Sequence, residues 1–532
     1  MKYETVIGLE VHVELATESK IFCSCSAHSF GADPNSHVCP ACCGMPGMLP
    51  VVNRRVVDFG MKAGLMLNCD INRVTTFDKK SYYYPDLPGA YQTTQWFAPV
   101  AVNGRVDIET SAGKKSVRIK QIHMEEDAGK LVHDISEGTT HVDFNRTSVP
   151  LIEIVSQPDL SSAEEVEAYL IRLRTLLRYA KVAECEMAHG TMRCDVNLSV
   201  RPEGSDVLGV RTEMKNMNSI EAIKRAIEFE TARHIDAIEN GTEVLVQETR
   251  RWDDAKGRSY AMRSKETAGD YRYFPDPNVM PVVIDDAWFD SIKASVPEFP
   301  EVKREKYIAM GLTEYDAERI SESIMLCECF EEASEACGNP KEVVNWITSD
   351  VMRILNAKQM TYEMLNLDNK AFGKLISLTV DGKISRANSK KILSAMFDDP
   401  TIEPESYAEA NDMEGIIVNL DTSYEFKRTK SLIKCKKFFD IDLECVGIEQ
   451  GEKGKYKNTL GAIVCKYKDG FVKVGSGFSE ELRDYYFNNQ NEIIGKIISV
   501  KYKEATKNKD GSESLQFPVF LCVREDKSVA DC

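Results

Sequence analysis

The sequence predicts an α+β protein: an antiparallel sheet with helices, then a helical region, then a small β-barrel. Three observations support this. Polar and apolar residues alternate with a period of two in several segments before residue 290. Apolar residues recur at helical spacing behind a capping signature, and again from residue 300 to residue 410. The chain from residue 414 onward is strand-rich and punctuated by Lys and Gly. Strands with segregated helices are typical of an α+β domain.

The first strand is predicted over residues 6–15, where the alternation places Glu10, His12 and Glu14 on one face and apolar residues on the other. Two later segments repeat this pattern, and their charged or polar faces carry Arg193, Asp195, Asn197 and Ser199, and Arg211, Glu213 and Lys215. Several strands with one apolar and one charged face indicate an antiparallel sheet with a functional or solvated side.

Two helices are predicted between these strands. The segment 161–165 (Ser-Ser-Ala-Glu-Glu) is a capping signature, followed by apolar residues at helical spacing up to Leu177. A second helix begins near Ile220 and ends near Gly241. From Pro300 to Ala410 the pattern is mostly helical, with short polar breaks at 338–340 and 399–400.

Composition limits the class of protein. A chain of 532 residues predicts about three or four domains. It lacks an apolar run of the roughly 20 residues that span a membrane, and its first residues lack a signal-peptide pattern. We therefore expect a cytoplasmic protein whose sixteen cysteines are reduced.

Charge is distributed unevenly along the chain. The net charge of −17 argues against indiscriminate nucleic-acid binding. From Glu414 onward there are 20 Lys and Arg against 19 Asp and Glu, which leaves 47 against 65 in the preceding residues. The two parts of the chain therefore resemble different kinds of protein.

A cysteine group near the N-terminus predicts a structural metal site. Cys23 and Cys25 are followed after thirteen residues by Cys39 and Cys42, with Cys43 as a spare thiol. Four thiolates on two close pairs saturate a tetrahedral Zn²⁺, so the spacing favours a structural zinc. The alternative is a set of buried, reduced cysteines.

Carboxylates are dense between residues 121 and 153, and this region is the best place to look for chemistry. Glu153 is a single acid inside an apolar run, which is costly to bury without a cation or a donor. A hard cation that carries nucleotide phosphates satisfies several carboxylates at once. Glu10, His12, Glu125 and Glu153 are the main candidates for such a metal–nucleotide site. Taken alone, His12 is also consistent with a solvated strand residue.

A third feature is the loop at residues 77–95, which mixes aromatic residues, prolines and hydrogen-bonding side chains. Such loops often line pockets, and Lys79 and Lys80 could meet phosphate. An ordinary exposed turn with aromatic anchors explains the same composition equally well.

These strings identify a family. Residues 1 to about 410 closely resemble the B subunits of the glutamyl/aspartyl-tRNA amidotransferases (GatB). The resemblance is carried by long, non-repetitive strings in the family's order, at residues 7–15, 77–88, 123–130, 149–154 and 192–197. It implies a cradle-like sheet domain followed by a helical domain.

The resemblance also implies an activity. The family's reaction is the ATP-dependent conversion of Glu-tRNA(Gln) and/or Asp-tRNA(Asn) to Gln-tRNA(Gln) and Asn-tRNA(Asn) through an acyl phosphate. It implies Mg²⁺ and ATP as cofactors. The partners that it implies are misacylated tRNA, an amidase that supplies ammonia (the A subunit) and the small C subunit.

The same resemblance suggests roles for individual residues. It places His12, Glu125 and Glu153 at the magnesium ion, with Glu10 nearby. The residues that it implies for the second shell or the nucleotide are Glu126, Asp195 and Glu213.

The end of the chain departs from the family. The family's tail domain begins after residue 382 and stops near Met413, and the remainder resembles the late motifs and the OB-fold domain of ATP-dependent DNA ligases. The matching strings are 414–417, 432–438 and 524–527, with the OB-like stretch between them. A complete ligase takes up the adenylate on the lysine of a Lys-x-Asp-Gly motif. The nearest string here is Val380-Asp381-Gly382, and no lysine stands two residues before Asp381.

We therefore predict three parts: a cradle domain over residues 1–292, a helical domain with a truncated tail over 293–412, and an OB-fold region over 413–532. The tail is expected not to ligate DNA. Its alternatives are a nucleic-acid-binding barrel that uses Lys434, Lys436 and neighbouring lysines, or a fragment joined by gene fusion or by an error of sequence assembly. A different overall function, a nucleic-acid-binding protein with an inactive cradle, is the alternative to the amidotransferase.

Overall fold

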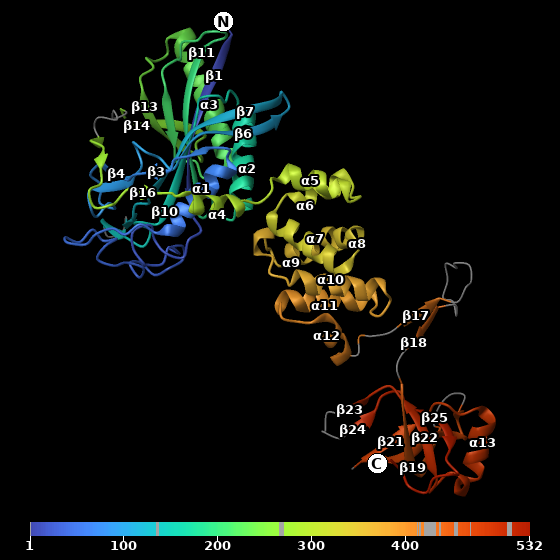
Figure 1. Ribbon diagram of the computed structural model, residues 1–532. Coiled ribbons are helices and arrows are strands. Elements are labelled where there is room, and N and C mark those ends of the chain that lie inside the picture. The colour runs from blue at the N-terminus through green and yellow to red at the C-terminus, as the bar shows by residue number, and fades with distance from the viewer. Residues whose placement is uncertain are drawn as a thin grey trace. The chain divides into compact units, whose positions relative to one another are not determined.

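The computed structural model describes residues 2–134, 138–264, 271–411, 413, 416–419, 432–435, 438–451, 456–468, 470–507 and 513–531. They form two compact units (Figure 1). The first contains Met1–Phe330 and Val344–Leu365, and the second contains Glu331–Val343 and Asn366–Cys532. Among the described residues, no helix is long and apolar enough to cross a membrane.

The first unit is built on a nine-stranded sheet. In spatial order its strands are β14 (Arg258–Ser264), β13 (Glu248–Asp253), β12 (Thr212–Lys215), β11 (Met192–Pro202), β1 (Tyr3–Glu14), β10 (Pro150–Ser156), β7 (Gly113–Glu126), β6 (Ala101–Thr110) and β2 (Asp70–Ile71).

Neighbouring strands of this sheet are antiparallel except β12 and β13, which pair in parallel. The prediction that the sheet is antiparallel is therefore wrong for this one pair of strands. The reason is the connection: helix α3 (Ile220–Asn240) lies between the two strands in sequence, and a long crossover of this kind permits parallel pairing.

Helices cover one face of the sheet. On β1 the residues Ile7, Leu9, Val11 and Val13 are at most 1% exposed. Helices α1 (Arg54–Met66), α2 (Ala163–Tyr179) and α3 contact β7, β6 and β11 respectively, and α2 also contacts both other helices. The three helices therefore lie on the same, apolar side, and the charged side chains of the strands point to the opposite side.

The predicted capping signature of α2 and the predicted end of α3 are confirmed, and the structure adds Ser219 as the cap that begins α3. The Ser162 side chain accepts a hydrogen bond from the Glu165 backbone N–H at the start of α2, and the Ser219 side chain accepts one from the Ala222 N–H at α3. Helix α3 ends at Gly241, which has φ 64°. Glycine adopts this left-handed conformation without the steric cost that a side chain adds.

Three small sheets complete the first unit. They are β15 (Phe274–Pro275), β4 (Asp78–Ser81) and β5 (Tyr91–Thr94); β16 (Val282–Val283) and β3 (Val74–Thr75); and β8 (Lys130–Asp134) and β9 (Thr139–Asp143).

The predicted helical region is also confirmed. Its helices are α4 (Asp286–Ala294), α5 (Pro300–Ala309), α6 (Glu314–Ser321), α7 (Ile324–Cys337), α8 (Pro340–Trp346), a π-helix (Ile347–Val351), α9 (Met352–Ala357), a 3₁₀ turn (Tyr362–Met364), α10 (Asn369–Val380), α11 (Arg386–Asp398) and α12 (Pro404–Ala410).

The last part of the chain is strand-rich, as predicted. A five-stranded sheet runs in the order β21 (Gly470–Val474), β20 (Leu460–Tyr467), β19 (Phe439–Gln450), β22 (Ile497–Tyr502) and β25 (Val519–Val523). The remaining elements are the pairs β17 (Ile416–Asn419) with β18 (Leu432–Cys435) and β23 (Ala505–Lys507) with β24 (Glu513–Leu515), helix α13 (Glu480–Asn488) and a 3₁₀ turn (Gln490–Glu492).

This sheet closes on itself. A parallel bridge joins Ser476, just after β21, to Val519 in β25, so the two edge strands meet. The sheet encloses an apolar core that includes Leu443, Ile463 and Val500. The architecture agrees with the predicted small barrel. Helix α13 was not predicted from the sequence.

Candidate functional site

The charged face of the nine-stranded sheet forms the floor of a cavity of about 740 Å³. Strand register decides which side chains meet there: His12 lies opposite Glu153 of β10 and opposite Arg193 of β11, and Glu10 lies opposite Asp195. The charged faces predicted for the separate strands therefore combine into one surface.

One group of side chains on this floor consists of His12, Glu125 and Glu153. Their nitrogen and oxygen ligand atoms all lie within 4.8 Å of one another. The His12 Nε2 is 3.4 Å from Glu153 Oε2 and 3.6 Å from Glu125 Oε1. Burial by itself lowers the pKa of His12, but the two carboxylates outweigh it and raise the pKa to about 9. The cluster therefore favours a positive charge at its centre.

His123 belongs to the same cluster, although it was not among the predicted site residues. Its Nε2 donates to Glu153 Oε2 at 2.8 Å, and the Glu153 carboxylate raises the pKa of His123 against the opposing effect of burial. The two histidines hold the pKa of Glu153 well below its usual range, although burial opposes them. The period-two alternation of β7, which puts His123 on the face of Glu125, was the signal that could have found it.

A second group consists of Glu10, Asp195 and Glu213, and its carboxylate oxygens also lie within 4.8 Å of one another. Burial raises the pKa of Glu10, and the charges of Glu153 and Glu213 raise it further. Three neighbours bind this group. Lys215 pairs with Asp195 and lies 3.3 Å from Glu213, Asn197 Nδ2 donates to Glu10 at 2.9 Å, and Thr249 Oγ1 donates to Glu213 at 2.8 Å.

The structure separates the two neighbouring lysines of β4. Lys80 lines the cavity, and the charge of Glu125 raises its pKa against the effect of burial. Lys79 points to the other side of β4, where its Nζ lies 3.7 Å from Asp276 and 4.0 Å from the centroid of the Tyr91 ring. A strand alternates its side chains, so adjacent lysines cannot both face the same cavity.

Glu126 likewise does not line the cavity in the described structure. Its carboxylate accepts hydrogen bonds from the Thr93 backbone N–H at 2.8 Å and from Ser148 Oγ at 2.6 Å. It is adjacent to Glu125 in β7 and therefore points away from the site. Its contacts connect β5 to β7, and β5 carries Thr94, whose hydroxyl donates to Glu125 at 3.3 Å.

A smaller cavity of about 250 Å³ lies beside the first and shares His12, Lys80 and Glu125 with it. Its other side contains Arg193, which donates to Asp127 at 2.8 Å. The cluster therefore lies at the boundary of two adjacent cavities.

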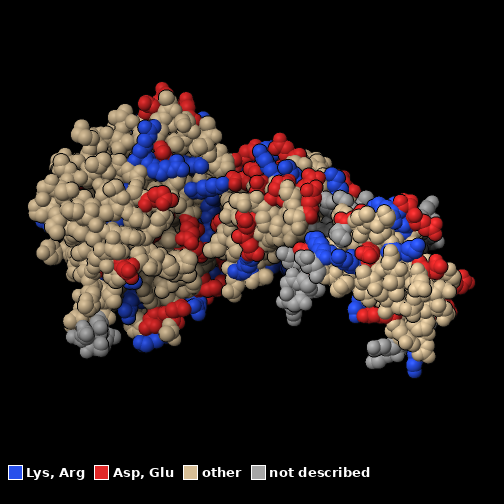
Figure 2. Space-filling model, turned by 90° about the horizontal axis from the view of Figure 1, so that it is seen from below, with Lys and Arg blue, Asp and Glu red and all other residues tan. Residues whose placement is uncertain are grey.

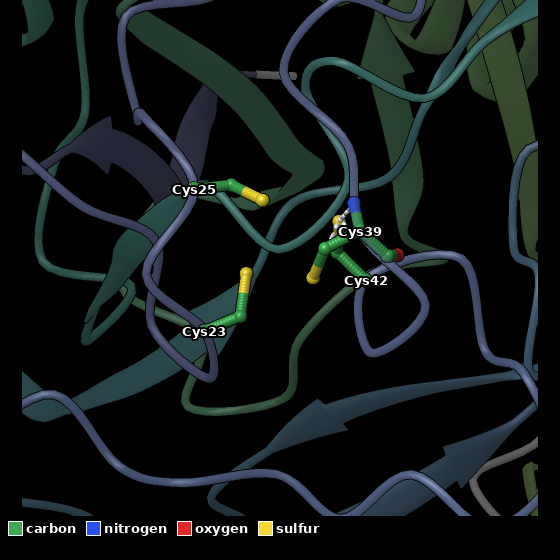
Figure 3. A group of neighbouring side chains, drawn as sticks. All are labelled: Cys23, Cys25, Cys39 and Cys42. Carbon is green, nitrogen blue, oxygen red and sulfur yellow. Dashed lines mark hydrogen bonds between the residues drawn. The ribbon is translucent and has the colours of Figure 1, made fainter.

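The four cysteines predicted to bind zinc lie together (Figure 3). Their sulfurs are all within 4.8 Å of one another, and those of Cys39 and Cys42 are 3.8 Å apart. Two sulfurs bound to one tetrahedral Zn²⁺ at about 2.3 Å are separated by about 3.8 Å, so the group fits that metal. A hydrogen bond with Cys23 lowers the pKa of Cys42 to about 4, and the buried Lys20 ammonium lies 3.6 Å from its sulfur.

Part of the predicted tail motifs lies outside the described residues, namely Glu414, Gly415, Lys436 and Lys437. Lys434 lies in β18, of which the backbone is described. Asp381 and Gly382 form the C-terminal cap of α10, where Gly382 has φ 74°.

Comparison with known proteins matches three parts of the chain to family models. The GatB/GatE catalytic domain matches residues 5–290, more than half of the chain. The GatB domain matches residues 328–420, and the DNA ligase OB-like domain matches residues 451–524.

Curated relatives match over most of their length. The B subunit of the aspartyl/glutamyl-tRNA(Asn/Gln) amidotransferase of Lachnospira eligens is 50% identical over 422 residues, which is 78% of this chain and 87% of the relative. The protein of the same name from Agathobacter rectalis is 47% identical over 463 residues, which is 87% of this chain and 94% of the relative.

Solved structures match a shorter stretch. The structure named Pmar-Lig_PreS3 is 36% identical over 23% of this chain and 29% of its own length, with a TM-score of 0.20. A Chlorella virus DNA ligase-adenylate is 27% identical over 20% of this chain and 38% of its own length, with a TM-score of 0.14. The chain thus spans less than half the length of either ligase structure.

Proposed function

The chain belongs to the family of aspartyl/glutamyl-tRNA(Asn/Gln) amidotransferase B subunits, and from this premise we propose that its acidic cavity activates a carboxylate carried by tRNA. One observation supports the proposal above all others. Five strands that are distant in the sequence bring two groups of metal-ligating side chains into one cavity, namely His12, Glu125 and Glu153, and Glu10, Asp195 and Glu213.

The proposed reaction converts Glu-tRNA(Gln) and/or Asp-tRNA(Asn) to Gln-tRNA(Gln) and Asn-tRNA(Asn). The side-chain carboxylate attacks the γ-phosphorus of ATP, and ADP leaves. Ammonia then attacks the carbonyl carbon of the acyl phosphate, inorganic phosphate leaves and the amide is formed. The ammonia comes from glutamine hydrolysed by a partner amidase, the A subunit, in a cytoplasmic heterotrimer with the small C subunit.

We propose that His12, Glu125 and Glu153 would hold Mg²⁺, which when bound would offset charge on the phosphates of ATP. Oxygen ligands suit this ion, and the histidine is the less usual ligand. Lys80 and Lys215, which both line the cavity, bring positive charge to the phosphates and the substrate carboxylate. His123 holds Glu153 in place through its 2.8 Å contact. Asp195, Glu213 and Glu10 line the same cavity and would face the same bound ATP and substrate.

The cysteine group and the domain boundaries are further proposals. Cys23, Cys25, Cys39 and Cys42 would bind a structural Zn²⁺ that fixes the loops around them, because four thiolates leave no open coordination position. We also propose a division of the chain into three parts, with boundaries after residues 292 and 412.

The test is reconstitution with the partner amidase, misacylated tRNA, ATP and glutamine, followed by measurement of amide on the tRNA. We expect Glu125→Ala and Glu153→Ala each to abolish turnover with little loss of folding. The matched control is Glu221→Ala, a substitution on an exposed position of α3. No amide or acyl phosphate from the wild-type chain with competent partners would refute the proposal.

A second function is favoured for the tail. Phe439 and Tyr502 lie side by side with ring centroids 5.8 Å apart, and Lys501 Nζ is 4.9 Å from the ring centroid of the exposed Phe438. Exposed aromatic rings next to lysine are typical of single-strand binding by OB folds. We expect Phe439→Ala to weaken binding of tRNA or nicked DNA, as deletion of the chain after residue 410 would. Unchanged affinity in both variants would leave the tail without this role.

A further inference from the structure

Two aromatic rings stand at the rim of the acidic cavity. Trp96 and Tyr273 both line it, and their rings stack with centroids 4.5 Å apart and planes 13° apart. Trp96 is nevertheless 44% exposed. Tyr273 covers one face of the indole, and the exposed part of the ring borders the cavity, where a planar ligand can stack on it.

The backbone that carries these rings is held by a small sheet. Asp78 of β4 pairs with Thr94 of β5 on one side and with Pro275 of β15 on the other. Its carboxylate is buried and accepts a hydrogen bond from the Trp96 N–H at 2.7 Å. This bond fixes the backbone of Trp96, and the stack on Tyr273 orients the indole before any ligand arrives, which reduces the entropy lost on binding.

The stacked pair lies close to the acidic cluster. Trp96 follows Thr94 by two residues, and the Thr94 hydroxyl contacts Glu125. Two residues of extended chain span about 7 Å. A base attached through a ribose to phosphate or to an aminoacyl group can therefore lie against Trp96 while its reacting end is at the carboxylates. Tyr271 adds a third ring, 6.0 Å from that of Tyr273.

We propose that Trp96 and Tyr273 form a stacking platform for an adenine base. This inference rests on the proposed function, which supplies two sources of the same base: ATP, and the 3′-terminal adenosine of the tRNA, which carries the amino acid. Stacking recognises the flat face of the base in either case.

The test measures dissociation constants on the full chain in its amidotransferase complex. The probes are a non-hydrolysable ATP analogue with Mg²⁺, uncharged tRNA with an intact 3′ end, and the same tRNA without its terminal adenosine. The variants are Trp96→Ala, Tyr273→Ala and the conservative Trp96→Phe. The control is Phe97→Ala, because Phe97 is 60% exposed but does not line the cavity in the described structure.

We expect Trp96→Ala to weaken binding of one adenine-bearing probe about 10-fold, with Trp96→Phe between it and the wild type and Phe97→Ala unchanged. Weaker binding of the ATP analogue identifies ATP as the source. Weaker binding of intact tRNA, without further loss on the truncated tRNA, identifies the terminal adenosine. Unchanged affinity for every probe, or an equal loss in Phe97→Ala, would overturn the platform.

Amide formation by the wild-type complex is measured in parallel. A complex that binds the ATP analogue through Trp96 but makes no amide would contradict the proposed function and leave the platform standing. Normal turnover in Trp96→Ala with unchanged affinities would contradict the platform and leave the proposed function standing.

Discussion

The two faces of the sheet around β12 carry buried charge in contrasting ways. On the helix side, Glu230 of α3 is fully buried, and its carboxylate contacts Arg233 Nε at 2.8 Å, Arg250 Nε at 3.2 Å and the Ser259 hydroxyl. Arg250 also contacts Glu248 at 2.8 Å. Arg233 also contacts Glu243 at 2.9 Å, so each guanidinium group of this network is held by at least two carboxylates.

On the cavity side, five carboxylates converge, and the pKa of Glu10 is raised by burial and by its acidic neighbours Glu153 and Glu213. The two faces therefore differ in what their buried charges can contact. Acidity alone does not mark a functional site, because both faces are acidic. A group of carboxylates and cations that lines an open cavity can take up a further ligand and marks one, whereas a group enclosed between a helix and the sheet serves the fold.

Charged side chains on the outer surface in Figure 2 do not distinguish the cavity side of the sheet from the helix side. On the described part of the face drawn in Figure 2, Lys and Arg side chains lie among Asp and Glu side chains. On that face charges of both signs are interspersed, and the contrast between the two faces of the sheet is a local one.

The largest expected effect is on the cavity side. Glu125→Gln keeps the size of the side chain but removes a charge that attracts a cation. We expect amide formation to fall on the order of 10⁴-fold, ~5.5 kcal/mol of transition-state stabilisation, while the free energy of unfolding changes by less than about 1 kcal/mol. Steady-state turnover and urea unfolding measure the two. If Glu125→Gln lowered the free energy of unfolding and left amide formation unchanged, the cavity side would not differ from the helix side.

The opposite result is expected on the helix side. Glu230→Ala removes the fully buried carboxylate from the half-buried Arg233 and Arg250 and should lower the free energy of unfolding of the first unit by about 3 kcal/mol. Hydrogen exchange at α3 and β13 reports it locally. Glu221→Ala, on the same helix but exposed, should change it by no more than about 0.5 kcal/mol. Equal losses of unfolding free energy in Glu230→Ala and Glu221→Ala would show that the network around Glu230 does not stabilise the fold.

The cysteine group extends the comparison to a third region, since four thiolates also require a cation. Metal analysis should find one zinc per chain, and Cys42→Ser should lose it. When free zinc is about 100 times its dissociation constant, the lost binding lowers the free energy of unfolding by about 2.7 kcal/mol. Cys43→Ser should keep the metal. A wild-type chain free of zinc, with all thiols reactive, would end this proposal.

The smallest effect concerns pH. Burial, and after it the charge of the nearby Arg233, lower the pKa of His234 to about 4. Because the unfolded chain takes up this proton near pH 6.5 and the folded chain does not, stability falls as the pH drops. The contribution of His234 amounts to about 1 kcal/mol between about pH 7 and pH 5.5. His234→Gln should show a correspondingly shallower loss of stability. Parallel curves for the two proteins would contradict a buried, neutral His234.

Much of the site was predictable strand by strand. The alternation in β1 and β11 placed Glu10, His12 and Asp195 on the correct faces, and the helix caps at Ser162 and Gly241 were found where expected. Lys79 was predicted to meet phosphate together with Lys80, but it points to the other side of β4. The resemblance implied Glu126 for the second shell or the nucleotide, and its carboxylate binds Thr93 and Ser148 on the side of β7 opposite to Glu125.

The sequence by itself determined what is local: the faces of the strands, the ends of the helices and the spacing of the four cysteines. Backbone stereochemistry imposes these patterns within a few residues. The tertiary structure decided which strands are neighbours, and therefore that Glu153 meets both His12 and His123 and that Trp96 stacks on Tyr273. Strand order depends on apolar faces from distant segments packing together, so no single segment contains that information.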